Sequence, residues 1–248
     1  MLTGATATAR KVRPRRLAHS TGVPLVSGEV KQSLADQAYM RLEEMIVTLK
    51  LRPGTILTES ALSRRIRIGR TPMREALQRL QVQRLVSTLP RRGVMVSEIS
   101  IVDHFALLET RRVLDRLISA KAARRATPDQ KEALRKAGRL MVKAASAGNM
   151  SEFMRHDAEF DRVIEAAARC TFALEASFPL HAHSRRFWYL YRHTGDIVRA
   201  AHHHAALMEA VARADEAAAA AASDELIDYL EEFARTVLDI PAEKKDKA

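Results

Sequence analysis

Apolar side chains recur at helical spacing near the start of the chain. They predict a helix that begins after Ser33, whose hydroxyl can cap it, and runs to about Leu49. Its predicted apolar face consists of Leu34, Ala38, Met45, Ile46 and Leu49. The sequence Leu51-Arg52-Pro53-Gly54 then ends the helix and turns the chain.

Two shorter helices follow this turn. Thr58 can cap the first, which is expected to end near Arg65. Thr71 can cap the second, with Pro72 at the first helical position, where its missing N–H costs nothing. The inward face of the second helix is predicted to be Met73, Ala76, Leu77 and Leu80.

Apolar and polar residues alternate after these helices, in LVSTLP and VMVSEIS. The alternation predicts a two-stranded hairpin, with Arg91-Arg92-Gly93 between the strands. Three helices and a hairpin in this order are typical of a winged helix-turn-helix, whose second and third helices dock on DNA.

Beyond residue 100 the pattern is helical almost to the end. The predicted segments cover roughly residues 102–125, 128–147, 150–168, 171–193, 196–213 and 215–238. Pro179 predicts a kink or break inside the fourth segment. The expected fold class is therefore mainly α, with an N-terminal winged helix-turn-helix followed by an all-helical bundle.

These patterns divide the chain into four parts. Residues 1–32 lack apolar periodicity and are expected to form a flexible basic arm. Residues 33–100 form the winged domain, 101–240 the helical domain for effector binding and dimerisation, and 241–248 a charged tail.

Charge separates the parts further. Residues 1–100 hold 18 Lys and Arg against 7 Asp and Glu, whereas residues 101–248 hold 23 of each, so the net charge of +11 lies in the first part. Such an imbalance indicates a nucleic acid or an anionic membrane as partner of that part. A single cysteine excludes a disulfide-stapled scaffold, and the absence of an apolar run of about 18 residues excludes a membrane-spanning helix. We expect DNA, and no membrane, as the partner.

The winged part resembles the DNA-binding domain of the GntR family of bacterial regulators. The resemblance covers residues 35–96 and rests on LRPGTIL, ALSRRI, GRTPMREALQRL and RRGVMV, in the family's order and spacing. It implies a base-reading arginine at Arg70, with further DNA contacts at Thr71, Arg74 and the wing tip, Arg92-Gly93. Gly69 departs from the Ser or Thr usual in the family, and Ser60 stands where some members place a base-contacting arginine.

Another basic cluster, in the second helix and the turn after it, consists of Arg64, Arg65 and Arg67. We expect them to track phosphates rather than read bases, and a merely solvated helix face is the alternative.

The helical part resembles the FCD domain of the FadR subfamily, through ETRRVLD (109–115), RHDAEFDRVIEAA (155–167) and HHHAALMEAVARAD (202–215). Metal-type FCD domains bind a divalent ion through one Asp and three His. Asp157 and His204 match that pattern, but Asp161 and Leu226 stand where two of the histidines belong. The resemblance leaves two readings open: a degenerate site of Asp157, Asp161 and His204 that holds Zn, Ni, Mn or Mg weakly, or no metal at all.

The same resemblance places Arg111 near an effector cavity. The segment HAHSRRFWYLYRH adds Arg185 and Tyr189, which would suit a small carboxylate, although core packing explains the aromatic residues equally well.

The sequence therefore predicts a cytoplasmic homodimer that regulates transcription, expected to be a repressor released from a pseudo-palindromic operator by a small organic or sugar acid. Motifs of enzymes, such as HExxH, GxSxG or a Gly-rich phosphate loop, do not occur. The alternatives are a helical metal-dependent enzyme and a sequence-indifferent DNA-binding protein.

Overall fold

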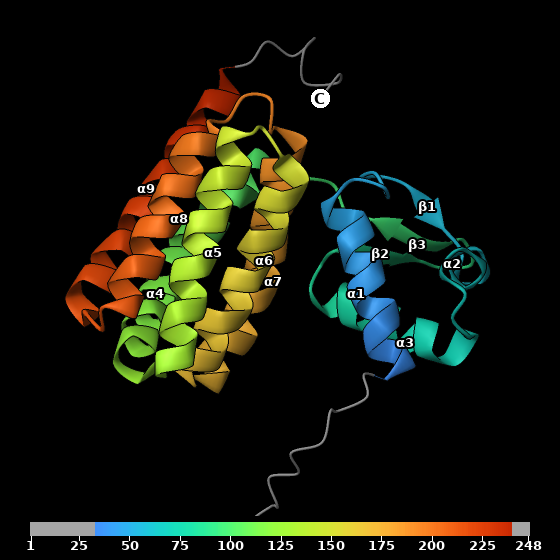
Figure 1. Ribbon diagram of the computed structural model, residues 1–248. Helices are drawn as coiled ribbons and strands as arrows, with labels where there is room; N and C mark the ends of the chain where they lie inside the picture. Colours follow the sequence, from blue (N-terminus) through green and yellow to red (C-terminus); the bar gives the residue numbers. More distant parts are fainter. Residues whose placement is uncertain (1–32, 240–248) are drawn as a thin grey trace, which may run out of the picture. The chain divides into compact units, whose positions relative to one another are not determined.

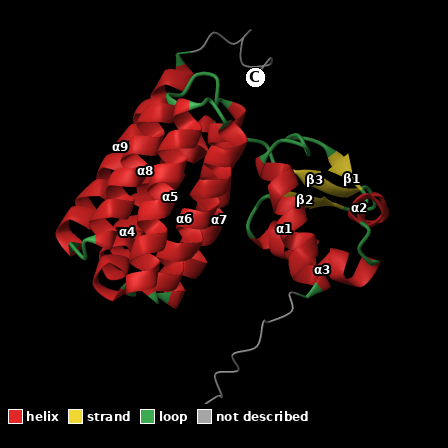
Figure 2. Ribbon diagram, in the orientation of Figure 1, coloured by secondary structure: helices red, strands yellow, loops and turns green. Residues whose placement is uncertain are grey.

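The computed structural model describes residues 33–239, so the basic arm expected at 1–32 and the charged tail expected at 241–248 lie outside the described residues. Its N-terminal part contains three helices and three short strands (Figures 1 and 2). They are α1 (Leu34–Val47), β1 (Ile56–Leu57), α2 (Glu59–Ile66), α3 (Arg70–Val82), β2 (Val86–Leu89) and β3 (Gly93–Val96).

Ser33 caps α1 as expected. Its hydroxyl accepts from the backbone N–H of Asp36 at 3.0 Å, and the Asp36 carboxylate accepts in return from the Ser33 backbone. The buried face is Ala38, Tyr39, Leu42, Ile46 and Val47. The expectation for Leu34 is wrong: it lies 57% exposed at the first position of α1, and burial along the helix begins only at Ala38.

The predicted hairpin is confirmed as the antiparallel pair β2–β3, with Val86 opposite Val96 and Leu89 opposite Gly93. A third strand, β1, pairs with the other edge of β3, which gives the order β1-β3-β2. The sequence did not predict β1, because two residues are too few to show an alternation.

Helix α3 begins two residues earlier than predicted. Gly69, not Thr71, is its N-cap, and the N–H of Met73 donates to the Gly69 carbonyl at 3.1 Å. Glycine has no side chain with which to cap the helix, so this end makes no side-chain cap hydrogen bond.

The remaining described residues form a bundle of helices (Figure 1). They are α4 (Ile101–Arg125), α5 (Pro128–Ser146), α6 (Met150–Ala168), α7 (Thr171–Leu190), α8 (Ile197–Ala212) and α9 (Glu216–Leu238). Helix α4 packs along α9, and α5 packs along α8. Of the kink or break expected at Pro179, the break does not occur, since α7 continues through this residue.

Alanine makes up much of the bundle core, where it alternates with larger side chains such as Leu108, Met141, Phe160 and Phe233. Small side chains let neighbouring helices approach closely. None of the helices within residues 33–239 has the length and apolar character that crossing a membrane requires.

Candidate functional site

The basic residues singled out in the winged part gather at the turn between α2 and α3. Arg64 and Arg65 lie exposed in the last turn of α2, and Arg70 is the exposed first residue of α3. Arg67 ends α2 in the left-handed conformation, at φ 56°, which reverses the chain between the two helices. Thr71 follows in the first turn of α3, also exposed.

Arg74, one turn into α3, is not free. Its guanidinium forms a two-pronged ion pair with Glu59 at the start of α2, with Nε–Oε1 at 3.3 Å and Nη2–Oε2 at 3.0 Å. The pair ties the two helices together and fixes where the Arg74 side chain points.

The wing places Arg92 exposed in the turn and Gly93 at the start of β3. Gly93 adopts φ +114°, and a Cβ atom there would lie 2.2 Å from the Leu57 carbonyl oxygen. Glycine is therefore needed for β1 to approach β3, a reason beyond the tight turn expected from the sequence.

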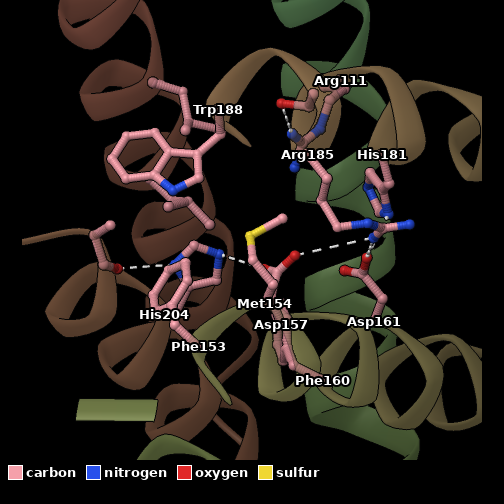
Figure 3. A pocket seen from close by; sticks show the side chains of 14 residues that line it. Arg111, Phe153, Met154, Asp157, Phe160, Asp161, His181, Arg185, Trp188 and His204 are labelled. Atoms are coloured by element: carbon pink, nitrogen blue, oxygen red, sulfur yellow. Dashed lines mark hydrogen bonds and ion pairs between the residues drawn. The ribbon is translucent and has the colours of Figure 1, made fainter. Parts of the chain in front are cut away.

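A second candidate site is a pocket within the helical bundle that encloses about 50 Å³ (Figure 3). Each water molecule needs roughly 10–15 Å³ of such space, so there is room for only a few waters without side-chain movement. The ionisable lining residues are Arg111, Asp157, Asp161, His181, Arg185 and His204. The apolar wall consists mainly of Phe153, Met154, Phe160, Trp188, Leu226 and Leu230.

Arg111 and His181 share one carboxylate beside the pocket. Nε of Arg111 and Nε2 of His181 each lie 2.9 Å from an oxygen of Asp115 on α4. The other ring nitrogen of His181 faces Asp161 at 3.4 Å. Arg111 also donates to the Ser184 hydroxyl at 2.7 Å, which joins α4 to α7.

Arg185 connects this group to Asp157 and His204 (Figure 3). Its Nη1 bonds Asp161 and lies 3.9 Å from Oδ2 of Asp157. Nε2 of His204 lies 3.0 Å from Oδ1 of Asp157, while its Nδ1 lies 2.8 Å from the Ala200 carbonyl. Both ring nitrogens of His204 therefore face hydrogen-bond acceptors.

These contacts shift the titrations of the buried groups. Burial disfavours the charged imidazole of His181, but Asp161 and Asp115 outweigh it and raise its pKa well above the usual value. Burial likewise opposes ionisation of Asp161, and His181 and Arg185 outweigh it and lower its pKa. The pKa of His204 is raised despite burial, because it bonds Asp157. These shifts favour the charged forms of His181, Asp161 and His204.

The structure brings together most of the residues that the sequence suggested for the helical part. Arg111, Asp157, Asp161, Arg185 and His204 all line the pocket. Tyr189 does not line it: Arg192 stacks over its ring, 4.7 Å from the centroid. Trp188, the neighbouring aromatic residue, takes its place in the wall.

Sequence reasoning missed His181 and Ser184. Their signal was helical spacing, because positions 181, 184, 185 and 188 fall on one face of a helix.

The residues present do not fit a metal ion. Asp161 is bonded to a guanidinium, His204 uses Nε2 on Asp157, and Leu226 offers no ligand atom. Within residues 33–239 no group of three or more His, Cys, Asp or Glu side chains is placed to hold an ion. The degenerate site of Asp157, Asp161 and His204 is therefore not assembled as a coordination sphere.

Helix α7 also contacts the winged part through residues outside the pocket. Ala182 is buried with the core of the winged part. His183 Nε2 lies 2.9 Å from the Gln83 carbonyl, at the end of α3, and Arg186 donates to the Ser97 carbonyl.

Comparison with known proteins decides the family. The pattern described as bacterial regulatory proteins, gntR family, matches residues 34–96, and the FCD domain matches residues 106–229. The chain belongs to the GntR family. Members of this family are transcriptional regulators and not enzymes, which confirms the prediction of a transcriptional regulator. The alternative of a helical metal-dependent enzyme is therefore wrong.

Proteins with similar sequences are also named HTH-type transcriptional regulators or repressors. The chain is 27% identical over 159 residues to the HTH-type transcriptional repressor RspR of Escherichia coli K12, covering 64% of this chain and 70% of RspR. It is 28% identical over 134 residues to an uncharacterized HTH-type regulator of Agrobacterium vitis, covering 53% and 78%. A Streptomyces ambofaciens regulator is 39% identical over 61 residues, 25% of this chain but only 26% of that protein.

Two solved structures share the fold. McbR/YncC of E. coli superposes with a TM-score of 0.74 at 18% identity, over 84% of this chain and 100% of that chain. A GntR regulator from Rhodococcus sp. RHA1 gives a TM-score of 0.59 at 20% identity, over 85% and 100%. Both confirm the mainly α class with a winged helix-turn-helix and a helical domain.

Proposed function

We propose that this chain is a ligand-responsive repressor that binds a pseudo-palindromic operator as a homodimer and leaves it when a small organic or sugar acid binds. The observation that carries the proposal is the start of α3. There the exposed Arg70 and a helix end without a side-chain cap lie beside the exposed Arg64 and Arg65. Uncapped N–H groups and the helix dipole favour a phosphate at such an end.

Arg70 is the residue we assign to base reading. A guanidinium can bridge O6 and N7 of guanine in the major groove, where the first residues of a recognition helix lie. Thr71 adds a hydroxyl for a phosphate, and Arg64 and Arg65 hold the backbone without reading sequence. Arg92 in the wing would enter the adjacent minor groove.

A second copy of this chain is the partner that fits α4. Val102, Val113 and Leu117 are 76%, 69% and 43% exposed there. Their spacing of 11 and 4 residues keeps them on one face of the helix. An apolar stripe on a long helix supports a two-fold dimer, in which each stripe covers the other and two winged domains face two half-sites.

The pocket supports an acidic effector. Its lining includes Arg111, Arg185 and His181, whose pKa is raised to about 10, against two carboxylates, so cationic groups outnumber acidic ones in the lining. Arg111 and Arg185 present N–H donors of the kind that bind carboxylates. Since the free space is small, such an effector has to move side chains to enter.

Helix α7 is the element through which that movement would act. It contributes His181, Ser184, Arg185 and Trp188 to the pocket, and its neighbouring residues His183 and Arg186 bond the winged part. A shift of α7 that accommodates an acid would strain those bonds. The word repressor in the name of RspR supports the proposed sign of regulation.

The test is selection from a library of random duplexes with the full-length chain, in the presence of excess sheared bulk DNA. A regulator enriches one pseudo-palindromic sequence, and the Arg70→Ala variant does not. Binding without enrichment would instead indicate the sequence-indifferent DNA-binding protein. The enriched duplex then serves in a screen of small carboxylic and sugar acids for release, with Arg111→Met as the variant that should no longer respond.

A further inference from the structure

Seven ionisable side chains run through the pocket in unbroken alternation of base and acid. In order they are Arg111, Asp115, His181, Asp161, Arg185, Asp157 and His204. Each of the three carboxylates therefore lies between two cationic groups. The second half of this series, from Asp161 to His204, can be followed in Figure 3.

Arg185 holds the central place in the series. Its guanidinium bonds Asp161 and approaches Asp157, the two α6 carboxylates at consecutive turns, and its Nη2 lies 3.9 Å from Glu43 on α1. The side chain is only 16% exposed. A guanidinium stays protonated at every pH at which proteins are studied, so this positive charge is permanent.

We propose that the guanidinium of Arg185 is the resident cation of this pocket and takes the role that a divalent ion has in metal-type FCD domains. The positive charge of Arg185 then balances the carboxylates of Asp157 and Asp161 without a metal ion, and it prevents a metal ion from binding there. The inference concerns the pocket alone and stands apart from the proposal that the chain reads an operator.

The two departures from the metal pattern agree with this exchange. In place of an imidazole, which has no negative charge to offset a guanidinium, Asp161 supplies a carboxylate to which Arg185 bonds. Leu226 replaces the other imidazole by an apolar side chain in the pocket wall. Buried carboxylates need a partner charge nearby, and in this pocket a side chain supplies it.

The exchange also narrows the ligand class. An acid in this pocket would accept hydrogen bonds from N–H donors instead of coordinating a metal ion. The pocket should therefore select acids by the placement of their hydrogen-bond acceptors and not by their ability to chelate a metal.

The experiment is titration calorimetry of the full-length chain with ZnCl2 and, separately, NiCl2. The wild type and Arg185→Lys, which both keep a cation, should not bind either ion. Arg185→Met frees Asp157, Asp161 and His204 and should gain binding. Adding Leu226→His to Arg185→Met should tighten it by a further roughly 10–100-fold, the size of effect that ligand surroundings have on metal affinity. Arg199→Met, which removes an exposed arginine paired with Glu232 on α9, is the matched control and should behave as the wild type.

Thermal unfolding with and without ZnCl2 covers the case in which Arg185→Met folds poorly. Zinc should raise the melting temperature of that variant and leave the wild type unchanged, because the ion replaces the lost charge.

Three outcomes would overturn the proposal. One is stoichiometric metal in the wild type after dialysis against a chelator. Another is tight zinc binding by Leu226→His alone, because the ion would then enter with Arg185 in place. The third is a folded Arg185→Met/Leu226→His variant that binds neither ion.

Discussion

The imidazole of His104 lies flat on the ring of Phe187, with 3.8 Å between ring centroids and 6° between ring planes. Burial, with the nearby charges of Arg111 and His183, lowers the pKa of His104 to about 3. The neutral imidazole is the form that this packing tolerates.

The first prediction follows from that pKa. The pKa of His104 in the folded chain lies below the ordinary 6.5. As the pH falls below about 6.5, His104 is therefore protonated in the unfolded chain but not in the folded chain, and the free energy of unfolding falls. His104 alone should then cost the wild type roughly 2 kcal/mol of unfolding free energy between pH 7.5 and pH 5, at about 1.4 kcal/mol per pH unit. His104→Phe keeps an aromatic ring on Phe187 and should lose that part of the pH dependence in urea unfolding. The control is His202→Gln, at an exposed position, and equal slopes for wild type and His104→Phe would contradict the prediction.

The second prediction concerns the wing. Gly93→Ala puts a Cβ atom 2.2 Å from the Leu57 carbonyl oxygen at φ +114°, so β1 and β3 have to separate. We expect a loss of about 3 kcal/mol of stability, from strain and overpacking together. Gly148→Ala is the matched control, since Gly148 also has a positive φ of +65° but no atom within 4 Å of the added Cβ. It should cost only about 1 kcal/mol, the price of the left-handed conformation, and equal losses would show that the approach of β1 is not what requires glycine.

Much of this fold was predictable from local pattern. The helices of the bundle follow apolar spacing and caps such as Thr127 and Pro128, which lie at the start of α5 as expected. The cap of α3 was not, because Gly69 gives no side-chain signal and Thr71 mimics one. The motifs identified Arg111, Asp157, Asp161 and His204, but neither His181 nor the bond of Asp161 to Arg185. That pairing joins α6 to α7, and a contact between side chains on two different helices leaves no periodicity in the sequence.

The third prediction tests the buried ion pairs. Asp161→Asn removes the carboxylate charge that lies between His181 and Arg185. The Asp161 side chain is only 14% exposed. Both cations then lose a buried partner, and we expect a loss of about 3–5 kcal/mol in urea unfolding at pH 7.5. Glu232→Gln breaks the two-pronged pair with Arg199, with distances of 2.8 and 2.7 Å, on an exposed surface. It should cost less than about 1 kcal/mol, and a similarly small effect of Asp161→Asn would mean that the chain of charges adds little to stability.

The fourth prediction uses the pair of Arg74 and Glu59. The two side chains are 62% and 38% exposed, so Glu59→Gln should change stability by less than about 1 kcal/mol. It removes a negative charge from the surface assigned to DNA and frees Arg74 for a phosphate. Binding to random duplexes should tighten, with a salt slope steeper by up to about one. Glu132→Gln, on α5 and exposed, is the control for the charge change alone and should leave random binding as it is. Weaker binding by Glu59→Gln would show instead that the pair holds Arg74 in the orientation that DNA requires.

The last prediction separates base reading from phosphate contact. Arg70 and Arg64 are both exposed arginines of the same surface, so a general loss of charge affects each variant equally. Arg70→Ala should cost roughly 1–3 kcal/mol more on the selected operator than on a duplex of random sequence, because only the operator offers the guanine that its guanidinium bridges. Arg64→Ala should weaken both duplexes by the same factor and reduce the salt slope by about one, since a phosphate contact is the same on every sequence. Fluorescence anisotropy with both duplexes at several salt concentrations measures the two quantities together. If Arg70→Ala weakened the operator and the random duplex alike, Arg70 would be a backbone contact, and specificity would have to come from the wing or from Arg74.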